Sequence, residues 1–157
     1  MLRPNFPTQF IPRVFFLLLL LAFVSCQTLD PHYKIQENLT LSIEAYNFEF
    51  ESKALKSSAR FVHPSIRSHY MAKSLEITQR VTFFEATNIE TKFFKNDVPA
   101  VLTLEGPEEG FTRAIVTIRY QVAVLPSTKL KTLTIEQEWV LHRGQWVIIP
   151  DLNSLLE

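Results

Sequence analysis

The chain has 157 residues, of which 46% are hydrophobic and 20% charged, and its 16 basic side chains balance 16 acidic ones. This composition is typical of one globular domain and excludes collagen-like and low-complexity designs. Two of the basic residues and no acid lie in the first 26 positions, which leaves 14 basic against 16 acidic residues in the remainder. We expect no nucleic-acid partner, because phosphate binding needs an excess of basic residues on one face.

The N-terminal segment has the features of an export signal. Arg3 and Arg13 precede an unbroken run of eleven apolar residues at positions 14–24. Eleven residues are too few to cross a bilayer, since the hydrocarbon core is about 30 Å thick and a helix rises about 1.5 Å per residue. The positive start, the short apolar run and the small residue Ser25 together predict a cleavable secretory signal.

The residues around Cys26 predict lipidation. Phe23-Val24-Ser25-Cys26 resembles the lipobox of bacterial lipoproteins, in which the cysteine receives a diacylglycerol, although that family more often has leucine at the position of Phe23. Cys26 is the only cysteine and so has no disulfide partner in the chain. The alternatives are a plain signal peptide with an unrelated cysteine and a short uncleaved anchor. The resemblance implies an exported, lipid-anchored protein, and Gln27 after the cysteine implies the outer membrane, facing the periplasm.

Two helices are predicted after the signal. Apolar residues spaced three, four or seven apart predict a long helix over residues 33–62. A second apolar stripe on the opposite side predicts that this helix is covered on two sides. His63-Pro64 ends it, and Pro64 begins a second helix that runs to about Gln79. The second stripe of the long helix consists of Leu41, Phe48, Leu55 and Val62.

From Val81 onward the apolar period changes from about 3.6 to 2, which predicts antiparallel strands. Glycines mark two turns, at 106–110 and at Arg143-Gly144. In the third strand Val116, Ile118 and Tyr120 share an apolar face. The predicted strands are 81–94, 98–105, 111–125, 129–142 and 145–150.

A long helix, a short helix and a run of long antiparallel strands predict an α+β fold, with the helices packed on one face of a curved sheet. The segment 136–149, with a tryptophan strand, the Arg143-Gly144 turn and Trp146, resembles the closing hairpin of nuclear transport factor 2-like (cystatin-like) domains. That resemblance implies a cone around the long helix with a pocket inside it. The chain thus divides into a signal peptide at 1–25, a tether at 26–32 and one α+β domain at 33–157.

Enzymes of that superfamily use acidic side chains inside the cone, often aspartates. A general base must be buried close to the substrate proton, which residues in a tether, a turn or a tail do not achieve. Glu136 and Glu138 share one strand face and are the remaining candidates for an acid–base pair. The alternative is that Glu136 lies opposite Arg119 in an ion pair on the outer face. The aspartates are Asp30, Asp97 and Asp151.

Three aromatic residues are candidates for lining the pocket: Tyr46, Tyr120 and Trp139. Aromatic residues at helical or strand spacing, such as Tyr46 and Tyr120, more often belong to an apolar core. The histidines have no spacing for a metal site, and His63 is expected to cap the second helix. No metal or cofactor is predicted.

Two functions of different classes follow from these observations. The first is a non-catalytic, membrane-tethered binding or scaffolding module of the cell envelope, which engages a small apolar ligand or an envelope protein. The second is a small isomerase-like or cyclase-like enzyme that acts on a hydrophobic ligand in the cone. A homodimer through the sheet is a further possibility, because such dimers are common in the superfamily and Ile115 lies on the predicted outer face.

Overall fold

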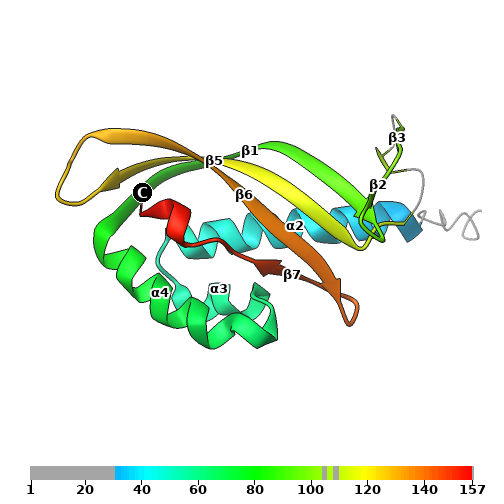
Figure 1. Ribbon diagram of the computed structural model, residues 1–157, viewed down its shortest axis with the longest axis horizontal. Helices are drawn as coiled ribbons and strands as arrows, with labels where there is room; N and C mark the ends of the chain where they lie inside the picture. The colour runs from blue at the N-terminus through cyan, green and yellow to red at the C-terminus, as the bar shows by residue number, and fades with distance from the viewer. Residues whose placement is uncertain (1–30, 104–105, 108–109, 157) are drawn as a thin grey trace, which may run out of the picture. The chain divides into compact units, whose positions relative to one another are not determined.

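The computed structural model describes residues 31–103, 106–107 and 110–156. The predicted signal peptide, Cys26 and Asp30 lie outside these residues, as does part of the glycine turn at 106–110. The described chain packs helices against one face of a five-stranded antiparallel sheet (Figure 1). The α+β class is therefore confirmed. No helix in these residues is long and apolar enough to span a bilayer.

The long helix α2 (Pro31–Glu51) ends well before Val62, so the prediction of one helix over 33–62 is wrong. Two hydrogen bonds close the helix end, from the Lys53 N–H to the Phe50 carbonyl (3.0 Å) and from the Ala54 N–H to the Glu49 carbonyl (2.8 Å). This is a Schellman motif, which needs a left-handed residue, and Lys53 takes that role with a φ of 62°. Glycine is the usual residue at such a position. The sequence therefore gives no signal for the break.

The chain then turns through short helical segments into a second long helix. His63 precedes Pro64 and caps the new helix, because its ring nitrogen Nδ1 accepts the Ser65 N–H at 3.4 Å. The cap and the second helix confirm the prediction. The segments are α3 (Leu55–Ser58), η1 (Ala59–Phe61), η2 (Pro64–Ile66) and α4 (Arg67–Arg80).

The sheet has the order β2-β1-β5-β6-β7, with all neighbours antiparallel. Four of the predicted strands match within two residues, but the strand predicted at 98–105 is wrong. Its described residues form two separate pieces, and the second pairs with β4 in a small sheet of its own. A last single-turn helix, η3 (Asn153–Leu155), follows the sheet. The strands are β1 (Val81–Lys95), β2 (Val98–Pro99), β3 (Leu102–Thr103), β4 (Gly106–Pro107), β5 (Arg113–Val124), β6 (Leu130–His142) and β7 (Gln145–Ile149).

The register between β5 and β6 corrects one predicted contact. Arg119 lies opposite Thr134, whereas Glu136 lies opposite Thr117. The predicted Glu136–Arg119 pair is therefore wrong. The chain reverses near Pro126, as expected. A turn centred there places Thr134 opposite Arg119, two positions before Glu136.

Two bulges shape β1. Its register with β5 shifts at Phe84 and at Ile89, and both side chains are exposed. Bulges increase the twist and bend of a strand. They accompany the curvature with which the sheet passes over α2 in Figure 1.

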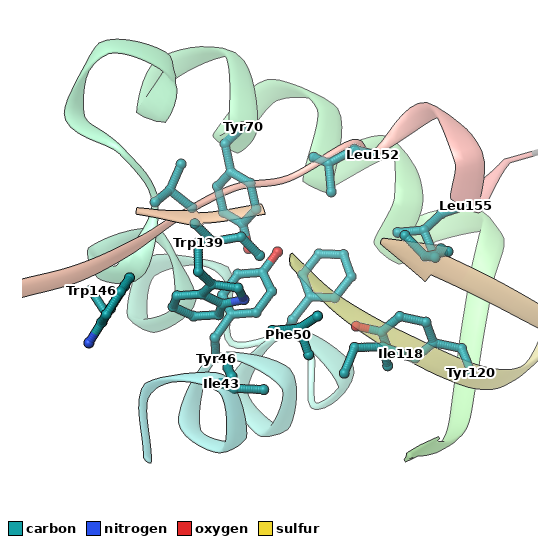
Figure 2. Close-up of a cluster of buried hydrophobic side chains, with 14 of the residues drawn as sticks. Ile43, Tyr46, Phe50, Tyr70, Ile118, Tyr120, Trp139, Trp146, Leu152 and Leu155 are labelled. Atoms are coloured by element: carbon teal, nitrogen blue, oxygen red, sulfur yellow. The ribbon is translucent and has the colours of Figure 1, made fainter. Parts of the chain in front are cut away.

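The core lies between the concave sheet face and one side of α2. Leu39, Ile43, Tyr46 and Phe50 are buried, as the first apolar stripe of the helix predicts. Figure 2 shows the rings of Tyr46 and Phe50 side by side in this cluster. The second stripe departs from the prediction, because Leu41 and Phe48 are exposed while Val62 is buried. Coverage of α2 on two sides is therefore wrong for the residues described.

Candidate binding surface on helix α2

The three predicted pocket residues lie in the packed core. Tyr46, Tyr120 and Trp139 are at most 2% exposed. The Tyr46 ring stacks on Phe50 at 5.7 Å between centroids and meets the edge of Trp139 at 5.8 Å (Figure 2). Aromatic rings thus fill the space under the curved sheet at this level, and none of the three residues lines the two grooves described below.

A buried polar network joins α2 to the sheet. The Tyr120 hydroxyl donates to Asn47 Oδ1 at 2.5 Å, and Gln137 Nε2 donates to the same oxygen at 2.7 Å. Gln137 Oε1 accepts the Trp139 indole N–H at 3.2 Å. Because buried polar groups are costly when unpaired, these bonds fix the helix against β5 and β6.

Burial determines the chemistry of the buried phenols. It raises the pKa of Tyr46 well above its ordinary value, and it also raises the pKa of Tyr120. For Tyr120, the nearby charge of Glu51 adds to the increase, while the hydrogen bond from Gln137 opposes it. Both phenols are therefore neutral hydrogen-bonding groups near neutral pH, and neither is suited to act as a base.

The two candidate acids lie on the convex side of the sheet. Glu136 is exposed. Ile135 and Gln137, which precede and follow it in β6, are buried and face the concave side. Glu138 Oε1 accepts Arg113 Nε at 2.6 Å in an ion pair. The guanidinium of Arg113 also sits over the Phe94 ring, 5.1 Å from its centroid. Neither carboxylate faces an enclosed space, so nothing in their surroundings favours acid–base catalysis.

Two large apolar residues stand on the outer side of α2. Leu41 is 57% exposed and Phe48 is 74% exposed. They are seven positions apart, which places them on one side of the helix about 10 Å along its axis from each other. We call this pair the α2 ridge. Large apolar side chains grouped on a surface are typical of interaction sites.

A groove of about 260 Å³ follows one flank of the ridge, between α2 and the sheet. We call it the β1 groove. Its floor includes Ile118 and Asn47, the residue that anchors the buried polar network. The groove is lined by Ile43, Glu44, Asn47, Phe48, Glu51, Ala86, Asn88 and Ile118.

A larger groove of about 470 Å³ follows the other flank, between α2, η1 and the turn that joins β6 to β7. We call it the hairpin groove. Arg60 stands at its side, with its guanidinium 4.6 Å from the centre of the Phe61 ring and paired with Glu49. Trp146 is held in place because its indole N–H donates to the Ile35 carbonyl at 3.1 Å. The groove is lined by Asn38, Leu41, Ser42, Ala45, Arg60, Phe61, Gly144, Gln145 and Trp146.

Three acids run beside the ridge at the same seven-residue spacing. Glu37, Glu44 and Glu51 have no cationic partner within the part of the chain that the structure describes. Glu44 and Glu51 also line the β1 groove. Burial raises the pKa of Glu51, which is half-buried at the C-terminal end of this acidic row. One flank of the ridge is therefore negatively charged.

The sequence predicts neither the acidic row nor the ridge. It shows the seven-residue repeat of Leu41 and Phe48, but that repeat predicts a second buried stripe. Nor does the sequence predict that His63 and His142 lie close together, with ring centroids 4.8 Å apart. No group of three or more metal-ligating side chains occurs among the described residues.

Comparisons with known proteins place the chain in no family. No protein-family model matches the sequence, and no curated protein matches it. Among solved structures, it is similar to the solution structure of a SEC-C motif-containing protein from Rhodopseudomonas palustris, with a TM-score of 0.49 and 10% sequence identity. The match covers 66% of this chain and 69% of the other. Similarity at this level says nothing about function.

Proposed function

We propose that this protein is a lipid-anchored, non-catalytic binding module of the cell envelope, and that the α2 ridge is where it docks a protein partner. The observation that carries the proposal is the exposure of Leu41 and Phe48 between two grooves. More than half of each side chain's surface is left open to solvent by the described residues. Exposing a ring such as that of Phe48 to water is unfavourable, and a partner that covers it gains that burial energy.

The shape of the surface favours a protein over a small ligand. A small-molecule site is usually an enclosed hollow that surrounds its ligand. Here the apolar side chains project outward, and the hollows lie on both sides of them. A partner surface can pack against the ridge while it places side chains in both grooves. Aromatic rings already occupy the core beneath the sheet, which leaves the outer side of α2 as the better candidate.

The acidic row indicates the charge of the partner. Glu37, Glu44 and Glu51 lie along one flank without cationic partners in the described chain. Complementary charge steers association and fixes orientation at interfaces. We infer a partner segment that presents apolar side chains to the ridge and basic side chains to this row.

The anchor is the second part of the proposal. The lipobox-like sequence ending at Cys26 supports export and lipidation, and two or three acyl chains give lasting attachment at about 0.8 kcal/mol per buried methylene. Gln27 supports the outer membrane as the destination. The enzyme alternative has no comparable support, because Glu136 and Glu138 lie on the convex face and outside both grooves.

Site-specific cross-linking in intact cells tests the docking surface. A photoreactive amino acid replaces Phe48 in the full-length protein, and the same group replaces the exposed Thr134 on the convex face as the control. We expect one discrete cross-linked product from position 48 and none from position 134. Adding Leu41→Glu to the position-48 variant should abolish that product.

Charge variants give a second measurement in the same cells. Glu44→Lys should reduce the position-48 product, whereas Glu136→Lys, the matched change on the convex face, should not. Equal products from positions 48 and 134, or none, would contradict the proposal. A product of twice the mass of the chain would also contradict it, because the occupant would then be a second copy and not a different protein.

A further inference from the structure

An exposed apolar run follows the turn after β1. Residues 98–102 read Val-Pro-Ala-Val-Leu. Val98, Val101 and Leu102 are 64%, 66% and 58% exposed. Single exposed aliphatic residues are ordinary, but an apolar run of five with three large exposed members is not expected on a surface that faces only water.

The backbone holds this run in place at one end of the sheet. Asn96 and Asp97 form a tight turn with φ values of 50° and 64°, and Val98 then pairs with Lys95. The Ala100 N–H donates to the Phe93 carbonyl at 2.8 Å. Leu102 pairs with Pro107 of β4. The run is therefore supported by β1 on one side and by β4 on the other.

The same end of the domain holds the start of α2. Strand β4 packs against α2, and in Figure 1 the blue N-terminal end of α2 lies at the end of the sheet where β2 and β3 are drawn. Tyr33, in the first turn of that helix, is 53% exposed. The exposed apolar run and the entry of the chain into the domain are thus at one pole.

The length of chain before α2 identifies what this pole faces. Helix α2 begins at Pro31, so five residue steps separate it from Cys26. Fully extended, they span about 17 Å. A lipid on Cys26, which belongs to the proposed function and on which this inference rests, therefore holds the start of α2 within about 17 Å of the bilayer surface.

We propose that Val98, Val101 and Leu102 insert into the lipid headgroup region beside the anchor and make this pole the membrane-facing end of the domain. Aliphatic side chains gain free energy at that depth, and together with the acyl chains they give a second point of attachment that fixes the orientation.

The orientation also explains the position of the α2 ridge. Leu41 and Phe48 lie about 15 and 26 Å along the helix from Pro31, at 1.5 Å per residue. With the pole at the membrane, the ridge is held away from the lipid where a protein partner can reach it.

The test uses the full-length lipidated protein, extracted from membranes and reconstituted in phosphatidylcholine vesicles that contain a phosphatidylcholine spin-labelled at its headgroup. Cys26 is the only native cysteine, so once it carries lipid an introduced cysteine is the only free thiol. Val98→Cys, Val101→Cys and Leu102→Cys are made one at a time and labelled with an environment-sensitive fluorophore. Thr128→Cys is the control, because the loop that joins β5 to β6 lies at the opposite end of β5 from the β1–β2 turn.

We expect the spin-labelled lipid to quench the label at 98, 101 and 102 several-fold more strongly than the label at 128. Equal quenching at all four positions would overturn the inference. Intact mass spectra of the same samples separate the two claims. Lipid on Cys26 without selective quenching defeats only the membrane-facing pole, whereas an unmodified Cys26 defeats the anchor and with it this inference.

Discussion

Gln137 is a polar side chain on an apolar strand face, and its position depends on three partners. Its amide bonds Asn47, Tyr120 and Trp139, and all four side chains are buried. The alternation along β6 predicts that Gln137 shares a face with Trp139. It does not predict Asn47 as a partner, because Asn47 lies 90 residues earlier, on α2.

Replacing Gln137 tests the energetic role of this network. Gln137→Leu should lower the free energy of unfolding by about 1–3 kcal/mol, because the Trp139 N–H and the Asn47 oxygen lose a buried partner. Gln121→Leu is the matched control on the convex face and should change it by less than about 0.5 kcal/mol. Urea denaturation measures both. Equal stabilities for the two variants would show that the network contributes nothing.

Glu51 gives a prediction with a defined pH dependence. Burial raises its pKa above the ordinary value of 4.5, so the charged form is disfavoured in the folded state. The contribution of Glu51 to the free energy of unfolding is therefore fully present below pH 4.5, where its carboxyl is protonated, and it is lost as the pH rises through the folded-state pKa. Glu51→Gln should therefore stabilise the fold at pH 7, by less than about 1 kcal/mol because the group is only half-buried.

The gain should disappear below pH 4.5, where the native carboxyl is also neutral. The difference in unfolding free energy between Glu51→Gln and the native chain, followed from pH 7 to pH 4, measures this. A difference that stays constant over that range would mean that the effect does not come from ionisation.

At the scale of single elements, α2 presents one buried and one exposed apolar side. Phe48 and Phe50 are two residues apart, yet they are 74% and 1% exposed. Phe50→Ala should cost about 3–5 kcal/mol, as expected for a ring removed from a packed core. Phe48→Ala should change the unfolding free energy by less than about 0.5 kcal/mol.

Thermal and chemical unfolding of the two alanine variants measure this contrast. A large loss of stability in Phe48→Ala would mean that the ridge supports the fold, and its exposure would no longer indicate a docking surface. Retained stability in Phe48→Ala, together with loss of the position-48 cross-link when Leu41→Glu is added, would separate a binding role from a structural one.

Strands β5 and β6 were predictable because alternation along each marks one buried face. Strand β1 is interrupted by two bulges, and β7 has three consecutive buried residues, so these two follow from their apolar content and flanking turns rather than from alternation. The end of α2 was not predictable, because Lys53 adopts the left-handed conformation that glycine usually takes, and its ammonium is held by the Thr78 carbonyl at 2.7 Å. The prediction of a strand at 98–105 is wrong for a different reason. Its apolar run looks like a buried strand, but only Val98 and Pro99 pair with β1.

At the scale of the whole molecule, the candidate site was harder to predict than the fold. Apolar spacing shows that Leu41 and Phe48 lie on one side of a helix, but it does not show whether another element covers that side. The two grooves depend on segments far apart in the sequence, such as Ser42 with Gln145 and Asn47 with Ala86. Only the folded chain brings these segments together.

Helix α2 connects the proposed anchor to the ridge. Its first turn lies within about 17 Å of the proposed lipid, and its ridge lies farther along the same helix. A short tether limits the partners to those that come close to the membrane surface.

Cys26→Ser removes the proposed lipid. It should leave the fold intact and prevent stable attachment to the membrane.

Anchoring through Cys26 is the claim on which the rest depends most, and the intact mass of the full-length gene product extracted from its own membranes tests it directly. We expect a polypeptide that begins at Cys26 and carries the added mass of a diacylglycerol, with or without a further acyl chain. A chain that retains residues 1–25, or one that begins elsewhere with Cys26 unmodified or absent, would contradict it.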